Sequence, residues 1–396
     1  MVVESEPCSA QPSSSPPIAA PAVAVEVLRA RAYLSRVAEP PAAALGVFVA
    51  QVGPVEAAER VRRGAVPDAV RAATGARRTV DRIDADLDAA AALGARLLAP
   101  EHPDWPHWAF AAFDNAGVRE LAAPLALWVR GPASLLEVSE RAVAVVGARA
   151  ATGYGVHVAG DLAAGLAAAE YTVVSGAAFG IDAAAHRGAL AARRPTVAVM
   201  ACGVDRAYPA AHSELLARIA ATGLVVSEYP PGAVPARHRF LVRNRLLAGI
   251  GAGTLVVEAG VRSGAQRTAA DARALGRVVM AVPGPVTSGL SAGCHELLRH
   301  GATLVTRPEE VLEAVGRLGI DLAVDRPRPT RATDHLDKAQ AAVHDALPTR
   351  AARDPRWLAM EAGLPLDVVR AGLIDLERLG LAEYRDGLWQ RATPRR

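Results

Sequence analysis

A dense basic stretch lies between Pro235 and Arg245, where four arginines and one histidine fall within nine residues. A guanidinium group forms parallel hydrogen bonds with phosphate oxygens, so this stretch could hold a phosphate or a nucleic acid. The stretch is predicted to open a helix, and cations beside a helix N-terminus are unfavourable unless an anion is present. A charge run is more often a solvated face, but this position favours anion binding, with Arg239 and Arg243 on one helical face.

Glycine-rich turns follow several predicted strands and lead into helices. The first turn contains Gly147 and Arg149, and a later one contains Ser263 and Gly264. Glycine lets the backbone approach a ligand closely, and the first amides of the following helix can bind an anion. Because the carboxyl ends of parallel strands share one edge of a sheet, we expect these turns to converge on a single ligand site.

These turns match neither of the two common nucleotide-binding motifs. The glycines at 147, 153 and 155 lack GxGxxG spacing, and no acidic residue follows Ser175-Gly176 to hold a ribose hydroxyl. The P-loop motif GxxxxGK[ST] is absent from a chain whose only lysine is Lys338. NAD-dependent and Walker-type chemistry are therefore disfavoured, and we expect no cofactor.

Catalytic and metal-binding patterns are weak. The sequence contains no GxSxG and no HExxH motif. Asp182 and His186 are spaced to share a helix face, but no third metal ligand is evident. We therefore expect no catalytic residues and no metal site. Phe179 is equally compatible with stacking on a base and with packing into the protein.

Length and composition limit the class of protein. The chain of 396 residues is long enough for two or three domains, and 51% hydrophobic with 21% charged residues excludes global disorder. The 3 cysteines have no CxxC spacing, which argues against a disulfide framework or a zinc finger and suits a reducing cytoplasm. No uncharged run is long enough to span a membrane, so we expect no membrane association.

The central part of the chain, residues 101–316, is predicted to form an α/β core. Short apolar, β-branched runs alternate there with helical stretches, which is typical of a Rossmann-like, doubly wound and mostly parallel sheet covered on both faces. The predicted strands are 125–129, 142–146, 172–175, 196–200, 224–227, 254–258, 278–282 and 303–305.

The remaining segments differ from the core in composition. Ser, Pro and Ala dominate the N-terminus, Ala-rich helical patterns follow it, and an Arg/Pro/Asp-rich stretch without periodicity comes after the core. A helical pattern over 364–379 followed by a short hairpin indicates a winged-helix-like module. We therefore predict a disordered tail over 1–24, a small helical domain over 25–100, a linker over 317–334 and a winged-helix-like domain over 335–396.

Several ordered motifs of the core resemble those of one known family. They include GARxxTxYG at 147–155, SGxAxGIDxxAHrxAL at 175–190, SEYPPG at 227–232, FxxRNR at 240–245 and VVEAxxxSGAxxTA at 256–269. In these motifs the chain is similar to the bacterial DNA-processing protein A family, also called DprA or Smf. The resemblance implies a non-enzymatic homodimer that binds and protects single-stranded DNA and helps to load a RecA-type recombinase in natural transformation and recombination.

The resemblance also implies which residues contact DNA. They are Gly147 and Arg149 of the first turn, Gly176, Phe179 and Gly180 of the second, and Arg243, Asn244 and Arg245 of the basic stretch. The interpretation from the residues agrees in kind, because amides and guanidinium groups hold the phosphates of a flexible strand without identifying its bases. Stacking on Phe179 or Tyr154 would add affinity.

Two other functions stay open. The first is a nucleotide hydrolase related to phosphoribohydrolases, although the chain has Glu258-Ala259-Gly260 and Ser263-Gly264 in place of a PGGxGTxxE loop. The second is a protein-only scaffold that acts through the winged helix. Release of base from nucleoside monophosphates would indicate the hydrolase, and a lack of affinity for oligo-dT at low salt would indicate the scaffold.

Overall fold

The computed structural model describes residues 23–316 and 333–392. These two stretches belong to two compact units, the first ending at Ala323 and the second beginning at Val324. The predicted tail, apart from its last two residues, and nearly all of the predicted linker lie outside the described residues.

The first unit is built on a mixed α/β sheet of nine strands, most of them parallel. Every strand predicted from the apolar runs is present, with ends that differ by at most two residues. Strands β1 and β2 pair antiparallel with each other, β2 pairs antiparallel with β6, and all the other pairs are parallel. The strands are β1 Ala95–Leu98, β2 Leu127–Arg130, β3 Ala142–Val146, β4 Thr172–Ser175, β5 Thr196–Met200, β6 Leu224–Ser227, β7 Gly253–Val256, β8 Val278–Ala281 and β9 Thr303–Leu304.

The strand order places a switch point in the middle of the sheet. The order is β1-β2-β6-β5-β4-β3-β7-β8-β9, so the chain runs outward from β3 to β6 and then returns to β7 on the other side of β3. The loops that follow β3 and β7 therefore diverge to opposite faces of the sheet. A crevice opens between such loops at the carboxyl edge, and this is where open α/β sheets bind their ligands.

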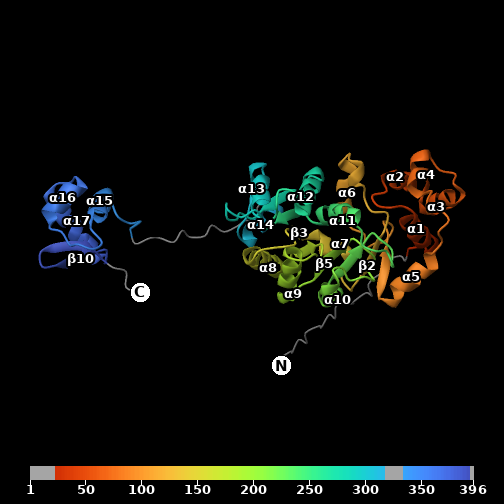
Figure 1. The fold of residues 1–396 in the computed structure, drawn as a ribbon, viewed down its shortest axis with the longest axis horizontal. Helices are drawn as coiled ribbons and strands as arrows, with labels where there is room; N and C mark the ends of the chain where they lie inside the picture. The colour runs from red at the N-terminus through yellow and green to blue at the C-terminus, as the bar shows by residue number, and fades with distance from the viewer. Residues whose placement is uncertain (1–22, 317–332, 393–396) are drawn as a thin grey trace, which may run out of the picture. The chain divides into compact units, whose positions relative to one another are not determined.

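Helices cover both faces of the sheet, which explains why its strands are apolar without alternation. Alternate residues of β3 belong to different hydrophobic clusters: Ala144 packs with α11 and α12, and Val145 packs with α8 and α9. Figure 1 shows α11 and α12 above the sheet and α8, α9 and α10 below it. The helices of the core are α6 His107–Asn115, α7 Leu135–Glu140, α8 Gly153–Ala168, α9 Ile181–Ala191, α10 Ser213–Thr222, α11 Arg237–Ile250, α12 Gly264–Ala274, α13 Ala292–Arg299 and α14 Pro308–Val315.

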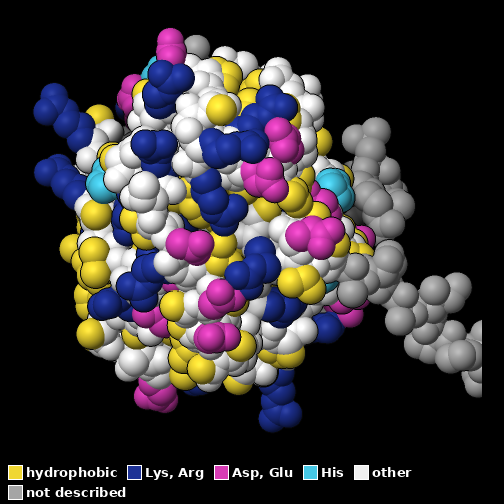
Figure 2. Space-filling model, turned by 90° about the vertical axis from the view of Figure 1, so that its right-hand side faces the viewer, with side chains coloured by type: hydrophobic (Ala, Val, Ile, Leu, Met, Phe, Trp, Pro, Cys, Tyr) yellow, Lys and Arg dark blue, Asp and Glu magenta, His cyan; other side chains and the backbone are white. Residues whose placement is uncertain are grey.

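Between residue 23 and the sheet, five helices are described: α1 Val25–Val37, α2 Ala43–Val52, α3 Pro54–Arg63, α4 Asp68–Thr74 and α5 Ile83–Ala92. The prediction of helices alone over 25–100 is wrong at β1, because Gly94 adopts a φ of 65° after α5 and the chain then turns into the sheet. The helices are also continuous with the core, since residues of α1 to α5 share one hydrophobic cluster with Trp128 and Met200 of the sheet. Figure 2 shows the face formed by these helices, with basic and acidic side chains interspersed.

The described part of the second unit, residues 333–392, contains three helices and a hairpin: α15 Lys338–Ala346, α16 Pro355–Ala362, α17 Leu366–Arg378, β10 Ala382–Arg385 and β11 Leu388–Arg391. Asp337 begins α15 with a capping box, and Asp354 caps α16 through two backbone amides. Val343, Leu358 and Leu373 are fully buried in its own core. Across the parts of the chain that the structure describes, no helix is long and apolar enough to cross a membrane.

Candidate nucleic-acid interface

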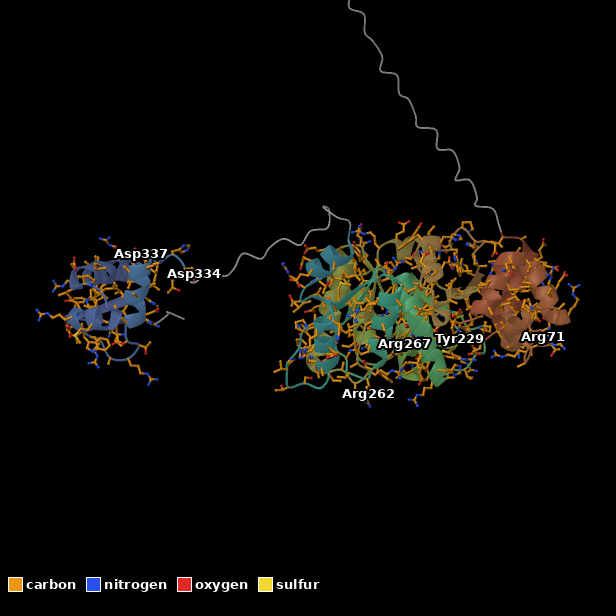
Figure 3. All side chains as sticks on the ribbon, turned by 90° about the horizontal axis from the view of Figure 1, so that it is seen from above. Arg71, Tyr229, Arg262, Arg267, Asp334 and Asp337 are labelled. Carbon is orange, nitrogen blue, oxygen red and sulfur yellow. The ribbon has the colours of Figure 1, made fainter. Side chains whose placement is uncertain are left out.

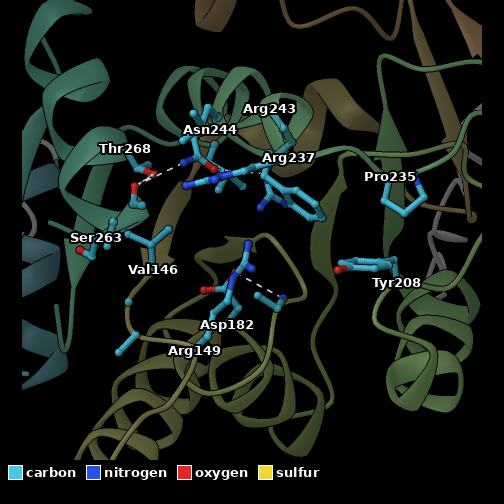
Figure 4. Close-up of a pocket in the computed structure, with 18 of the residues that line it drawn as sticks. Val146, Arg149, Asp182, Tyr208, Pro235, Arg237, Arg243, Asn244, Ser263 and Thr268 are labelled. Atoms are coloured by element: carbon cyan, nitrogen blue, oxygen red, sulfur yellow. Dashed lines mark hydrogen bonds between the residues drawn. The ribbon is translucent and has the colours of Figure 1, made fainter. Parts of the chain in front are cut away.

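A cavity of about 830 Å³ lies at the carboxyl edge of the sheet, at the switch point. It is lined by the loops that follow β3, β4, β5, β6 and β7, so five separate chain segments meet there. Figure 4 shows Arg149 and Asp182 on one side, Arg243 and Asn244 on the opposite side, and Ser263 and Tyr208 at the two ends. The expected convergence of the turns on one edge is observed.

Three exposed arginines, Arg149, Arg237 and Arg262, line this cavity from two loops and the start of α11. None of them forms an ion pair with a carboxylate among the residues described, although the charge of Arg149 acts on Asp182 in the same lining. Arg149 lies over the ring of Phe240 at 5.1 Å, which fixes its guanidinium at the cavity wall. Arg262 lies at the outer margin of the first unit in Figure 3. The arrangement leaves three positive charges free to meet an anionic ligand.

Arg243 contributes a buried charge at the floor of the cavity. Its Nη1 donates to the carbonyl oxygens of Gly176, at 3.0 Å, and of Val199, and its Nε donates to Asn244 Oδ1 at 3.3 Å. Burial lowers the pKa of Arg243, although the nearby Asp182 opposes this shift. A Cβ atom at position 176 would overlap the guanidinium. Gly176 does not line the cavity itself, but it leaves the space that the Arg243 side chain occupies.

Asp182 is the carboxylate in the cavity lining. Its Oδ2 accepts hydrogen bonds from the amides of Gly176, at 3.2 Å, and Ala178, at 3.4 Å. Burial raises the pKa of Asp182, and the charge of Arg243 offsets part of that shift. His186 follows Asp182 by four residues on α9. Its Nδ1 lies 2.8 Å from Thr196 Oγ1 inside the core.

The start of α12 presents polar groups to the cavity. Ser263 is the N-cap residue of this helix without a side-chain capping bond, and its Oγ is buried with no hydrogen-bond partner in the described structure. Asn244 Nδ2 donates to the carbonyl oxygen of Gly264 at 3.3 Å and ties α11 to this turn. A buried hydroxyl beside the free amides of a helix N-terminus is suited to an anion.

The corresponding site at the start of α8 is already filled, contrary to expectation. Glu258 Oε2 accepts from the amide of Thr152 at 2.9 Å, and Oε1 accepts from the Thr152 hydroxyl at 2.6 Å. The chain's own carboxylate thus takes the place that a ligand anion was predicted to take. Gly155 permits this contact, since a Cβ atom there would overlap the carboxylate.

Two predicted glycines are required by the backbone at the cavity. Gly180 has a φ of 75°, and a Cβ atom there would overlap the carbonyl oxygen of Ala148. Gly147 lies against α9, where an added Cβ would come within 2.5 Å of Ile181 Cγ1 and 2.8 Å of the Glu258 carbonyl oxygen. Both positions need glycine so that the first two turns can pack against each other.

The aromatic residues of the cavity are Tyr208 and Phe240, whose ring centroids lie 5.2 Å apart at 46°. The residues considered for stacking from the sequence were Phe179, for which packing was equally open, and Tyr154. Phe179 packs edge-on against His212 and does not line the cavity, and the hydroxyl of Tyr154 donates to the Pro283 carbonyl oxygen at 2.7 Å. The signal for Phe240 was its place inside the basic stretch.

Two predicted arginines lie outside the cavity. Arg245 is fully buried, with Nη2 2.7 Å from Glu228 Oε1 and Nε 2.9 Å from the Ala122 carbonyl oxygen. Arg239 forms a two-point ion pair with Glu39 at 2.8 and 3.1 Å. Successive helix residues rotate by about 100°, so Arg245, two positions after Arg243, faces nearly the opposite way.

Known proteins resemble the chain over both its sequence and its fold. The model of the family described as DNA recombination-mediator protein A matches residues 96–316. The putative DNA processing protein DprA of Mycobacterium tuberculosis (strain H37Rv) is 58% identical over 365 residues, which cover 91% of this chain and 94% of that protein. The Smf protein of Escherichia coli is 40% identical over 205 residues, 52% of this chain and 54% of its own length.

The X-ray structure of DNA processing protein A from Streptococcus pneumoniae has the same core arrangement. It superposes with a TM-score of 0.61 at 30% sequence identity, covering 74% of this chain and 99% of that one. The family match spans the strands and all five loops that form the cavity. The chain therefore belongs to the DNA recombination-mediator protein A family, which includes the DprA and Smf proteins.

Proposed function

We propose that this protein binds and protects single-stranded DNA in the cytoplasm and assists the loading of a RecA-type recombinase during DNA uptake and recombination. The observation that carries the proposal is the cavity at the switch point, where Arg149, Arg237 and Arg262 lack carboxylate partners in the described structure. Guanidinium groups on three separate segments of the chain match a flexible, multiply charged ligand better than a single small anion.

The aromatic pair supports an unpaired strand over a duplex. Tyr208 and Phe240 line the cavity beside Arg149, so a base can stack there only after it leaves a helical stack. Stacking of this kind is tolerant of sequence, because every base has a π face. No base-reading pattern of side chains is needed, and the proposal predicts little sequence preference.

Binding without catalysis is part of the proposal. A hydrolase would need a carboxylate free to act on a substrate, yet Glu258 is held by Thr152 and Asp182 is held by two backbone amides. Incubation with nucleoside monophosphates tests the hydrolase alternative directly. Release of free base by the purified protein would overturn the assignment.

The decisive experiment is a salt titration of oligo-dT and duplex binding with an arginine double variant. Arg149→Glu with Arg237→Glu removes two phosphate contacts, so the slope of log K against log salt is expected to become shallower by about 1.4, at ~0.7 per single-strand phosphate. Arg187→Glu with Arg218→Glu, on α9 and α10, is the charge-matched control, because both arginines are exposed and neither lines the cavity. An unchanged slope in the double variant would falsify the proposal.

The assembly and the second unit belong to the same proposal. Three helices followed by a hairpin with Asp386 and Gly387 at its turn support a winged-helix-like module in the second unit. We infer a homodimer and a recombinase partner from the family resemblance alone. The mass of the protein measured with and without oligo-dT tests the dimer, and recombinase filament assembly on protein-coated single strands tests the partner.

A further inference from the structure

A second, smaller cavity of about 240 Å³ lies where the N-terminal helices meet the core. We name it the junction cavity. Its polar lining comes from both sides of this contact, with Arg36, Glu39 and Arg77 from the helical segment and Tyr229 and Arg239 from the core. It has no part in the site described above.

The junction cavity carries an excess of positive charge. Glu39 accepts from Arg77 at 2.7 Å and from Arg239 at 2.8 and 3.1 Å, and His238 Nε2 lies 3.2 Å from the same carboxylate. Burial alone would raise the pKa of Glu39, but the hydrogen bonds from the arginines hold it below its usual value. Two guanidinium groups thus share one carboxylate, whereas the neighbouring Arg36 is balanced by Asp86 at 2.7 and 2.5 Å.

A buried polar group without a partner belongs to the same lining. Tyr229 lines the junction cavity with only 3% of its surface exposed, and its hydroxyl has no hydrogen-bond partner in the described structure. The Arg239 guanidinium lies over its ring at 4.5 Å. A buried hydroxyl without a partner costs free energy that a ligand oxygen would recover.

One short chain segment separates the junction cavity from the main cavity. Gly232, Ala233 and Val234 line the smaller cavity, and Pro235 and Ala236 line the larger one. The first turn of α11 also contributes to both cavities, because Arg237 lines the main cavity and Arg239 lines the junction cavity. A strand that leaves the main cavity past Arg237 therefore crosses only this segment to reach Arg239 and Arg77.

We propose that the junction cavity is a second phosphate site, in which Arg77, Arg239 and the Tyr229 hydroxyl hold one phosphate group beside Glu39. Its volume is below the ~300 Å³ at which pockets for whole small molecules begin, so it suits a phosphate better than a complete nucleotide. The phosphate comes either from the strand bound in the main cavity, which rests on the proposed function, or from free phosphate in solution.

Two substitutions change the charge of the junction cavity in opposite directions. Glu39→Gln keeps the shape and releases both arginines, so long oligo-dT is expected to bind more tightly, with a salt slope steeper by about 0.7. Arg77→Ala removes the surplus charge and is expected to make that slope shallower by about 0.7. Short oligo-dT that fills only the main cavity should respond to neither change. Arg71→Ala on α4 is the control for loss of an exposed arginine from the same helical segment.

The measurement compares short and long oligo-dT across a salt series, with thermal unfolding in inorganic phosphate as a second arm. Opposite slope changes in the two variants, for long strands only, assign the site to the DNA backbone. Stronger stabilisation of Glu39→Gln than of wild type by phosphate, without a slope change, assigns it to free phosphate.

The proposal is overturned if both variants match wild type in the oligo-dT salt series and in thermal unfolding with phosphate. Glu39 would then only hold the N-terminal helices against the core. Arg77→Ala keeps the Glu39–Arg239 pair, so the test survives if Glu39→Gln fails to fold. The outcome is separable from the proposed function, since loss of that function would show in the Arg149 and Arg237 double variant instead.

Discussion

Three arginines of helix α1 and three arginines of the main cavity have opposite surroundings. In the helices Arg29, Arg31 and Arg36 are paired with Asp84, Glu101 and Asp86 respectively. In the cavity Arg149, Arg237 and Arg262 form no ion pair with a carboxylate of the described residues, although their three segments meet at one site. The difference teaches that the partner of an arginine, rather than its local density, separates a structural charge from a binding one.

Helix α11 contains both kinds of arginine within nine residues. Arg237 and Arg243 line the main cavity, while Arg239 and Arg245 are neutralised by Glu39 and Glu228. Glu39 comes from a part of the chain 200 residues away, whereas Glu228 lies only 17 residues before Arg245. One basic stretch therefore serves two purposes, holding the fold together and presenting charge to a ligand.

The largest expected effect comes from removing a paired arginine of α11, whose role is to stabilise the fold. Arg245→Ala leaves Glu228 buried without its ion-pair partner, which is expected to lower the free energy of unfolding by about 3–5 kcal/mol. Arg237→Ala, at an exposed position on the same helix, should stay within about 0.5 kcal/mol of wild type. Urea denaturation measures both. A stable Arg245→Ala protein that loses oligo-dT binding would reverse the two roles.

The next effect sharpens the comparison for aromatic residues. Phe240 lines the main cavity under Arg149, and Phe179 packs on His212 outside it. Phe240→Leu is expected to weaken oligo-dT binding by about 1–3 kcal/mol, the range for loss of one stacked base. Phe179→Leu is the matched control and should bind as wild type. Fluorescence anisotropy with labelled oligo-dT measures both, and equal losses would contradict the placement of the stacking site.

Local patterns in the sequence were sufficient to predict the sheet and the glycine turns. The apolar runs that form β3 to β6 depend on burial of both faces, and the glycines at 147 and 180 are dictated by close backbone contact. The short strand β1 was missed, because four residues after an Ala-rich helix carry little periodicity.

Partners that are distant in sequence could not be predicted in the same way. Glu258 fills the start of α8 from 106 residues away, and Glu39 reaches Arg239 from 200 residues away. Nothing near Thr152 or Arg239 in the sequence reveals those carboxylates. The separation of Arg243 from Arg245 was within reach, because residues two apart on a helix face away from each other.

The smallest expected effect concerns Asp182, the carboxylate that breaks the rule that the main cavity is positive. Burial raises its pKa above the ordinary 3.8, while Arg243 and the amides of Ala178 and Gly176 offset part of the shift. The folded protein therefore keeps this proton to higher pH than the unfolded chain does. The sign follows from linkage: folding is favoured below the unfolded pKa, and this contribution is lost as pH rises through the folded pKa.

Asp182→Asn cannot release a proton, so its free energy of unfolding should lack this decline when urea denaturation is followed upward from about pH 4. Oligo-dT binding to wild type should also strengthen as pH falls, because the ionised carboxylate repels a bound phosphate and its protonated form does not. Asp161→Asn on α8, at an exposed position away from the main cavity, should keep the wild-type profile. If Asp182→Asn also keeps the wild-type pH dependence of unfolding and of oligo-dT binding, Asp182 does not oppose the ligand. The main cavity then behaves as a uniformly positive site, like its unpaired arginines.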